Sequence, residues 1–162
     1  MGMPPIVDLE KEFTLHKTML ELVDNRLLKS AHDCSDGGLS IALVESCFKR
    51  ESSINKDTPA VLGCEVNIPL KYREDFELFG ESHSRIIVSI TPKDVDKFEE
   101  ICNKHSQNMI KLGVVQGNVI KISATQYETN GVRHYRPETN GVHHYSINSD
   151  LNHLKKLYES VF

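Results

Sequence analysis

The sequence has little that marks a nucleic-acid-binding, membrane or disulfide-bonded protein. Its formal net charge is −4 and its basic residues form no block, which argues against a nucleic-acid surface. No apolar run approaches the roughly 18 residues that span a bilayer, and the first residues lack a secretory signal. The four cysteines form no CxxC pair, which predicts free thiols in a reducing compartment. These absences predict a cytoplasmic protein without nucleic-acid or membrane partners.

Two common catalytic motifs are also missing. The chain has a glycine-rich segment at 33–38, but neither Lys-Ser nor Lys-Thr follows it, so it is not a P-loop. No Gly-x-Ser-x-Gly nucleophile elbow occurs. What is present is a chain of 162 residues, 39% hydrophobic and 26% charged. This size and composition predict one globular domain over residues 1–162 with an ordinary core.

Apolar periodicity predicts alternating helices and strands. Helices are expected at 8–29, 36–50, 71–79, 93–105 and 151–161, and strands at 30–34, 61–68, 85–90, 109–115 and 119–122. The first helix carries an apolar stripe of Leu9, Phe13, Leu20, Val23 and Leu27. In the strand at 61–68, apolar and polar residues alternate, which puts Leu62, Cys64, Val66 and Ile68 on one face. The strand at 85–90 is typical of a central strand covered on both faces, and a tight turn joins the last two strands. The order predicts an α+β fold with a mixed β-sheet covered by helices.

A ten-residue repeat at 128–145 interrupts this pattern. Glu-Thr-Asn-Gly-Val and His-Tyr occur twice, a period too short for a solenoid. Because Asn-Gly favours tight turns, we interpret 126–147 as an inserted polar hairpin or loop. A metal site on His134, His143 and His144 is the alternative, but no carboxylate or thiol partner is fixed nearby. No metal ligand is therefore assigned.

One polar, glycine-rich turn lies between a predicted strand and a predicted helix: Asp33-Cys34-Ser35-Asp36-Gly37-Gly38. Its two glycines let backbone approach a ligand closely, and the first turn of the helix offers unpaired N–H groups. Helix capping by Ser35 or Asp36 explains the same residues without a ligand. Asp33 and Asp36 would repel a bare phosphate unless Mg²⁺ or other cations were present. An amine or a hydroxyl-rich ligand edge suits them better.

A second polar segment leads into the apolar strand at 85–90: Glu81-Ser82-His83-Ser84-Arg85. Such a cluster is either the solvent-facing mouth of the strand or part of a binding site. A plain ion pair also accounts for Glu81 and Arg85. The candidate ligand-binding residues are Asp33, Ser35, Asp36, Gly37, Gly38, Glu81, Ser82, His83 and Arg85. No catalytic residue is assigned.

Together, the segments at 30–40 and 78–89 resemble the C-terminal domain of the phosphoribosylformylglycinamidine synthase family, whose fold is similar to aminoimidazole ribonucleotide synthetase. The resemblance covers about residues 9–122 and 147–162, and the 128–145 repeat lies outside the family pattern. It implies the last B-type domain of a purine-biosynthesis ligase. That ligase converts formylglycinamide ribonucleotide into formylglycinamidine ribonucleotide with ATP, Mg²⁺ and glutamine-derived ammonia.

The resemblance also implies roles and partners. Glu81, Ser82 and His83 match a substrate-binding Glu-Ser-Gln segment, with His83 in place of glutamine, and the 33–38 turn is expected to line the same cleft. The catalytic histidine and most ATP and Mg²⁺ ligands of the family lie on A-type domains. The chain is therefore expected to be inactive alone and to bind no cofactor tightly.

The expected partners are the remaining synthetase domains, with a glutaminase subunit and a small accessory subunit in the multi-subunit form. An apolar surface left by the missing A-type domain also predicts self-association, with a homodimer as one form. The alternative function is a free-standing nucleotide- or anion-binding module of the same fold.

Overall fold

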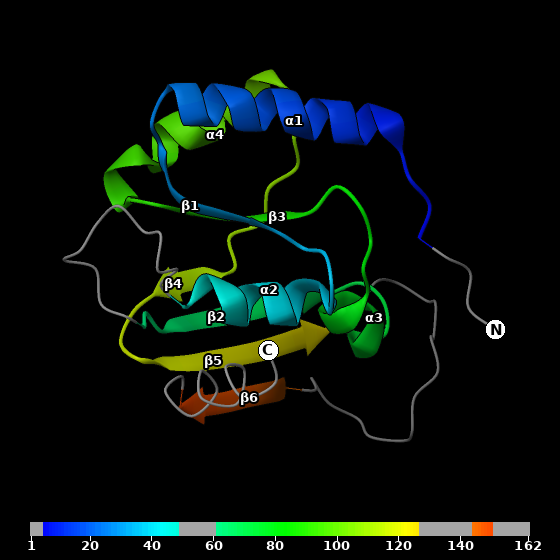
Figure 1. Ribbon diagram of the computed structural model, residues 1–162, viewed down its shortest axis with the longest axis vertical. Coiled ribbons are helices and arrows are strands. Elements are labelled where there is room, and N and C mark those ends of the chain that lie inside the picture. Colours follow the sequence, from blue (N-terminus) through cyan, green and yellow to red (C-terminus); the bar gives the residue numbers. More distant parts are fainter. Residues whose placement is uncertain (1–4, 49–60, 127–143, 151–162) are drawn as a thin grey trace. The chain divides into compact units, whose positions relative to one another are not determined.

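The computed structural model describes residues 5–48, 61–126 and 144–150. Its elements are α1 (Leu9–Asp24), β1 (Leu28–Asp33), α2 (Gly38–Ser46), β2 (Cys64–Leu70), α3 (Glu74–Phe79), β3 (Ile86–Ile90), the 3-10 turn η1 (Pro92–Asp94), α4 (Val95–Lys104), β4 (Gly113–Val115), β5 (Val119–Gln126) and β6 (His144–Asp150) (Figure 1). The chain divides into two compact units, Met1–Ala42 with Glu81–Lys111 and Leu43–Gly80 with Leu112–Phe162. The predicted α+β class is confirmed, because helices accompany a mixed sheet.

In the first unit, α1 is shorter than the predicted helix. Asp8 caps its start, where the side chain accepts hydrogen bonds from the backbone N–H groups of Glu10 and Lys11. The helix ends at Asp24, and Arg26 follows with a positive φ of 56°. β1 therefore begins at Leu28, two residues before the predicted strand. The apolar spacing overextends the helix because Leu27, although outside it, continues the same periodicity.

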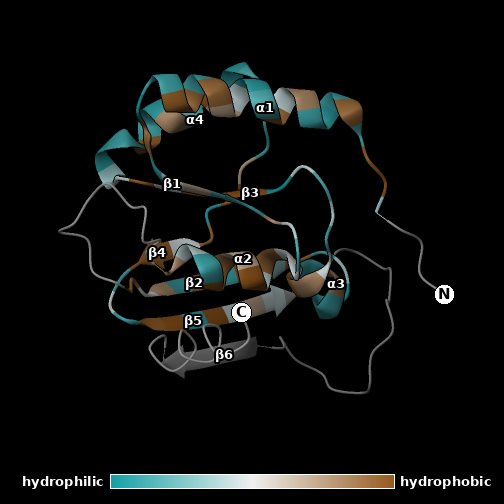
Figure 2. Ribbon diagram, viewed as in Figure 1, coloured by the Kyte–Doolittle hydropathy of each residue, from teal (hydrophilic) through white to brown (hydrophobic). Residues whose placement is uncertain are grey.

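The face that α1 buries also differs from the predicted stripe. Leu15, Thr18 and Leu22 are the buried residues, and α1 packs beside α4 along the β1–β3 ladder (Figure 1). The core there comprises Leu22, Leu27 and Ile101, with Met19, Leu28 and Phe98 packed against it. Four of the five residues of the predicted stripe are exposed, with exposed fractions of 78% for Leu9, 60% for Phe13, 66% for Leu20 and 56% for Val23, whereas the fifth, Leu27, is buried. The sequence of α1 thus holds two sets of apolar residues, one buried beside α4 and one exposed. Figure 2 shows brown, hydrophobic stretches between teal, hydrophilic ones along α1.

The strand β3 is not the central strand that its apolar run predicted. It pairs antiparallel with β1, with Asp33 opposite Ile86, and within the described ranges it has no other strand partner. All five of its residues are half-buried. A continuous apolar run indicates that both faces are covered, but it does not fix how many strands flank it.

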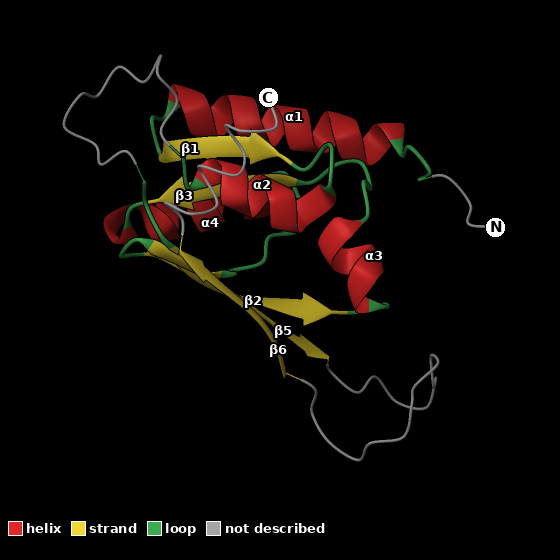
Figure 3. Ribbon diagram, turned by 60° about the horizontal axis from the view of Figure 1, so that its bottom comes forward, coloured by secondary structure: helices red, strands yellow, loops and turns green. Residues whose placement is uncertain are grey.

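The second unit holds a mixed sheet of order β4-β2-β5-β6 (Figure 3). β2 alternates as predicted, because Cys64, Val66 and Ile68 are buried on one face. It lies parallel to β5, whose Ile120 is 0% exposed, and antiparallel to β4. The strand β6 pairs antiparallel with β5 and overlaps the end of the predicted insertion.

The two strands that the predicted tight turn joins, β4 and β5, do not pair with each other. The turn at Gly117, with a φ of 63°, is present, but β2 lies between the two strands that it connects. β4 is also confined to Gly113–Val115, four residues shorter at its start than predicted. Turn residues indicate where a chain changes direction, but they do not determine which strand it pairs with next.

Two predicted features fall partly or wholly outside the described residues. These are the helix at 151–161 and most of the 128–145 repeat, including His134 and His143. Among the residues that the structure does describe, no group of three His, Cys, Asp or Glu side chains is placed to hold a metal ion. None of the helices in the same ranges has the length and apolar character needed to cross a membrane.

A charged cluster fastens α1 to α4 and gives a pH-dependent prediction. Lys104 Nζ lies 2.8 and 2.9 Å from the two Glu21 carboxylate oxygens, and His105 Nε2 lies 2.7 Å from Oε2. The hydrogen bonds from Lys104 and then from His105 hold the pKa of Glu21 below its ordinary value of 4.5. The stabilisation is therefore fully present above pH 4.5 and is lost as pH falls through the lowered folded-state pKa.

We expect Glu21→Gln to lower the midpoint of thermal unfolding at neutral pH, because Lys104 and His105 lose their carboxylate. The difference from the unsubstituted chain should close at acidic pH, once the pH has fallen through the lowered pKa of Glu21 and the wild-type carboxylate is protonated. Thermal melts at both pH values measure this, with the exposed Glu100→Gln on α4 as control. A difference that stays constant between the two pH values would contradict the assignment.

Candidate functional site

The two polar segments lie next to each other in the first unit because β1 and β3 deliver them together. The ladder ends at the pair of Asp33 and Ile86. Beyond this pair, the Cys34 N–H donates to the Arg85 carbonyl at 3.0 Å. The segment that follows β1 and the segment that precedes β3 therefore remain in contact beyond the end of the ladder. A further bond, from the Gly38 N–H to the Ser35 carbonyl at 3.0 Å, closes the turn that starts α2.

Both glycines of the turn are required by its backbone. Gly37 has a φ of 75° and Gly38 a φ of 68°, which is the left-handed region that costs other residues about 1–2 kcal/mol. A Cβ on Gly37 would also lie 2.5 Å from Cγ1 of Ile41. The turn therefore brings its backbone closer to neighbouring groups than a side chain allows.

A direct contact joins the two segments at the start of α2. The Gly37 N–H donates to Oε1 of Glu81 at 3.0 Å, across 44 positions of sequence. A carboxylate is favoured there, because the first N–H groups of a helix carry partial positive charge. The predicted convergence of the turn and the 81–85 segment is thus present in the structure.

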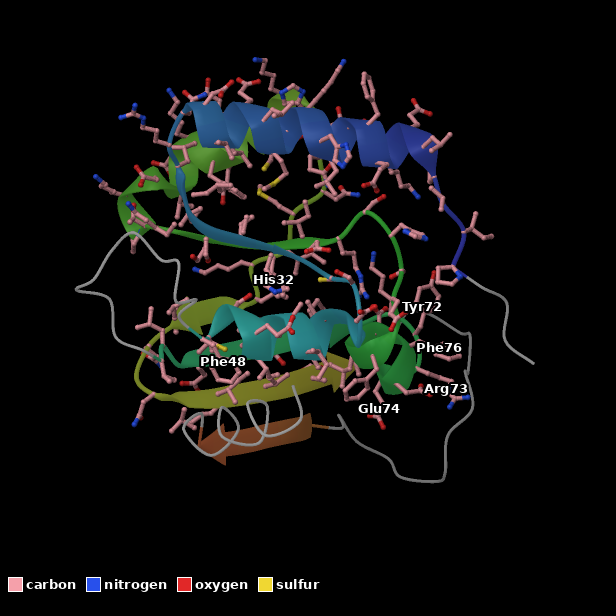
Figure 4. All side chains as sticks on the ribbon, viewed as in Figure 1. His32, Phe48, Tyr72, Arg73, Glu74 and Phe76 are labelled. Carbon is pink, nitrogen blue, oxygen red and sulfur yellow. The ribbon has the colours of Figure 1, made fainter. Side chains whose placement is uncertain are left out.

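The rim of the turn is acidic and exposed. The Ser35 hydroxyl donates to the Asp33 carboxylate, whose side chain is 73% exposed. Next to it, His32 Nδ1 lies 2.7 Å from the Asp33 carbonyl oxygen, with its ring labelled below β1 in Figure 4. With exposed Asp36 and Glu81, the turn presents carboxylate oxygens that accept hydrogen bonds. Such a surface suits donor groups such as hydroxyls and amines better than a bare phosphate.

Three further groups in or near the two segments are not among the candidate ligand-binding residues. Cys34 is buried, and burial raises the pKa of its thiol while the Arg85 charge opposes that rise. The Ser40 hydroxyl in α2 is buried and has no hydrogen-bond partner among the described residues. The Ser84 hydroxyl donates to Glu12 of α1 at 2.5 Å. No local signal predicts this last bond, since 72 positions separate its partners.

Of the remaining predicted residues, Asp36 lies in the turn and Ser82 and His83 follow Glu81 in the second segment. Asp36, Ser82 and His83 are exposed. The predicted site residues line neither the surface hollow beside Gln116 and Lys121 nor the one beside Leu20 and Val23. The ligand-binding role of the predicted residues, and the cleft they are expected to line, stay predictions.

Comparison with known proteins identifies the family. A family described as "AIR synthase related protein, C-terminal domain" matches residues 2–123. The chain belongs to this family. Because the match ends before the 128–145 repeat, the repeat lies outside the part that defines the AIR synthase related domain.

Curated relatives show which member of this family the chain resembles. The chain is 44% identical over 117 residues to phosphoribosylformylglycinamidine synthase subunit PurL of Anaeromyxobacter dehalogenans (strain 2CP-C). That alignment covers 72% of this chain and 15% of the relative. The chain thus spans about one seventh of the curated relative that it matches, and the predicted resemblance to phosphoribosylformylglycinamidine synthase is confirmed.

Solved structures agree on the fold. T. maritima PurL complexed with ATP is similar with a TM-score of 0.60 and 23% identity, over 93% of this chain and 23% of that chain. PurLQS from Thermotoga maritima is similar with a TM-score of 0.57 and 22% identity, over 90% of this chain and 22% of that chain. At this level of identity the structures support the AIR-synthase-related fold.

Proposed function

We propose that the chain is the C-terminal, AIR-synthase-like part of a phosphoribosylformylglycinamidine synthase. The whole enzyme would be a cytoplasmic ligase that converts formylglycinamide ribonucleotide into formylglycinamidine ribonucleotide. ATP would activate the amide oxygen as a phosphoryl leaving group, and ammonia would displace it. The observation that carries this proposal is the 44% identity to a PurL subunit over 117 residues.

Within that enzyme, the turn at 33–38 and the 81–85 segment would form part of a ligand-facing wall. Asp33, Asp36 and Glu81 would accept hydrogen bonds from donor groups of a ribonucleotide, such as ribose hydroxyls or the amide N–H. They would not hold a phosphate unaided, because their negative charges repel it.

ATP and Mg²⁺ belong to the proposal for the whole enzyme, since a similar PurL structure is complexed with ATP. Mg²⁺ prefers carboxylate and phosphate oxygens in octahedral geometry. Among the described residues no three His, Cys, Asp or Glu side chains converge on a common metal position. We assign the metal, and the catalytic groups, to the remainder of the synthetase.

The exposed stripe of α1 is the surface that we propose docks on the remainder of the synthetase. Leu9, Phe13, Leu20 and Val23 place four apolar side chains in solvent on one helix. Beside them, a hollow of about 300 Å³ is lined by His16, Met19, Leu20 and Val23. Exposed patches of this kind mark interaction surfaces, and most of the relative's length lies outside the matched region. Glutaminase and accessory subunits would join as in an assembly such as PurLQS.

Complementation tests the function. We expect no turnover when the chain alone is given ATP, ammonia and formylglycinamide ribonucleotide. Turnover should appear when the chain is mixed with A. dehalogenans PurL that lacks its matching C-terminal region. Turnover by the chain alone, or no rescue of the truncated PurL, would overturn the proposal. Micromolar ATP binding by the chain without rescue would favour the stand-alone binding module instead.

The same mixture tests the docking surface. Leu20→Asp should abolish rescue, because a charge in the centre of the stripe cannot be desolvated without a partner. Lys97→Asp, on an exposed position of α4, is the control for an added acidic residue and should rescue fully. Circular dichroism establishes that both variants fold. Equal rescue by the two variants would place the docking surface elsewhere.

A further inference from the structure

Two buried thiols of the second unit lie in contact. Cys47 follows α2, Cys64 begins β2, and their Sγ atoms are 3.7 Å apart. Their exposed fractions are 5% and 6%. A disulfide bond is about 2.05 Å long, so the sulfurs need to approach by roughly 1.7 Å, which is within the reach of side-chain rotation.

The backbone that carries the two cysteines is already aligned. The Leu62 N–H donates to the Cys47 carbonyl at 2.9 Å. The next residue, Phe48, forms an antiparallel bridge with Val61, and Figure 4 labels it at the end of α2. The segments are therefore fastened together on the side of the pair away from β2. A bond between the sulfurs would therefore link two segments that are already in contact when both cysteines are thiols.

The two thiols differ in acidity and in access. The Cys47 thiol donates to the Cys64 sulfur, which raises the pKa of Cys47 and lowers the pKa of Cys64. Cys64 also lines a surface hollow of about 320 Å³, with Gln116 and Lys121 among the other lining residues. The residue beside this hollow is thus also the one whose thiol has more thiolate character, and thiolate is the form that attacks a disulfide.

We propose that Cys47 and Cys64 form an oxidative modification site at which a small dissolved disulfide produces an intramolecular bridge. The Cys64 thiolate attacks one sulfur of the reagent, whose S–S bond breaks, and one half leaves as a thiolate that takes up a proton. Cys47 then loses its proton and attacks Cys64 Sγ, which expels the second half as a thiol. The two cysteines lose two protons and two electrons in total, and the reagent gains them as two thiols.

Mass spectrometry of the folded 162-residue chain tests the bridge, with oxidised glutathione as the probe. After oxidation, we expect the intact mass to fall by two hydrogens, one from each of two thiols. Alkylation of the denatured chain should then modify only the two thiols that are not in the bridge. Peptide mapping should link Cys47 to Cys64 and find Cys34 and Cys102 alkylated once the chain is denatured. The absence of a bridge in the folded chain, or a bridge that includes Cys34 or Cys102, would overturn the proposal.

Single substitutions test the order of attack. Cys47→Ser should accumulate glutathione on Cys64, because no second thiol is left to displace it. Cys64→Ser should leave Cys47 largely unmodified, and Cys102→Ser, also at a buried cysteine, should form the bridge like the unsubstituted chain. Glutathione on Cys47 would refute the order. If a serine variant fails to fold, the peptide map of the unsubstituted chain still decides whether the bridge forms.

Discussion

Gly63→Ala should destabilise the second unit by about 3 kcal/mol or more, one of the largest effects of any single substitution in this chain. A Cβ at this position would lie 2.5 Å from the carbonyl oxygens of Gln116 and Val119 and 2.6 Å from the Val119 nitrogen. All three are backbone atoms, so rotation of a side chain cannot relieve the overlap. The segments must separate instead.

Separation would break a reciprocal pair of hydrogen bonds. The Gly63 N–H donates to the Gly117 carbonyl at 2.8 Å, and the Gln116 N–H donates to the Gly63 carbonyl at 2.9 Å. These bonds fix the turn that lies between β4 and β5 against the start of β2. Their loss adds to the steric cost, since each buried group that is left unpaired costs about 1–3 kcal/mol.

Chemical denaturation followed by circular dichroism measures the loss, and Gly117→Ala is the matched control in the same turn. Gly117 has a φ of 63°, and a Cβ added there would meet nothing within 4 Å. Its substitution should therefore cost only the left-handed backbone strain of about 1–2 kcal/mol. Equal free-energy losses for the two variants would show that close backbone approach at Gly63 does not determine stability.

Local chemistry made some features predictable from the sequence. Alternation of apolar and polar residues identified the buried face of β2, because successive strand residues point to opposite sides. The paired glycines at 37 and 38 marked a turn, and both have positive φ in the structure. The sequence also predicted that this turn lies close to Glu81. That prediction rested on the family resemblance and on the position of each segment at the end of a strand.

Other features depend on competition between distant parts of the chain, which no local pattern contains. Two stripes of α1 are apolar, and only the position of α4 decides that Leu15 and Leu22 are buried while Leu20 is exposed. The insertion of β2 between β4 and β5 is a choice of partner that the intervening turn does not encode. The Ser84–Glu12 bond likewise requires the fold before it can be recognised.

Gly37→Ala is the substitution that should affect the proposed ligand-facing wall most. Alanine at a φ of 75° carries about 1–2 kcal/mol of strain, and its Cβ would lie 2.5 Å from Cγ1 and 3.0 Å from Cβ of Ile41. The backbone strain and the close contact with Ile41 can be relieved only if the turn moves. That movement would shift the Gly37 N–H, which donates to the Glu81 carboxylate at 3.0 Å.

In the complementation assay, we expect Gly37→Ala to lower the rescued kcat/KM by about tenfold or more, which corresponds to roughly 1.4 kcal/mol of lost binding or positioning. Gly117→Ala shares the positive φ but lies in the second unit with open space around it, and it should rescue at nearly the wild-type level. The comparison controls for the left-handed backbone strain that both variants carry, and only Gly37→Ala adds the contact with Ile41. If Gly37→Ala rescues as well as Gly117→Ala, the turn at 33–38 is a structural corner and the ligand contacts of the enzyme lie elsewhere.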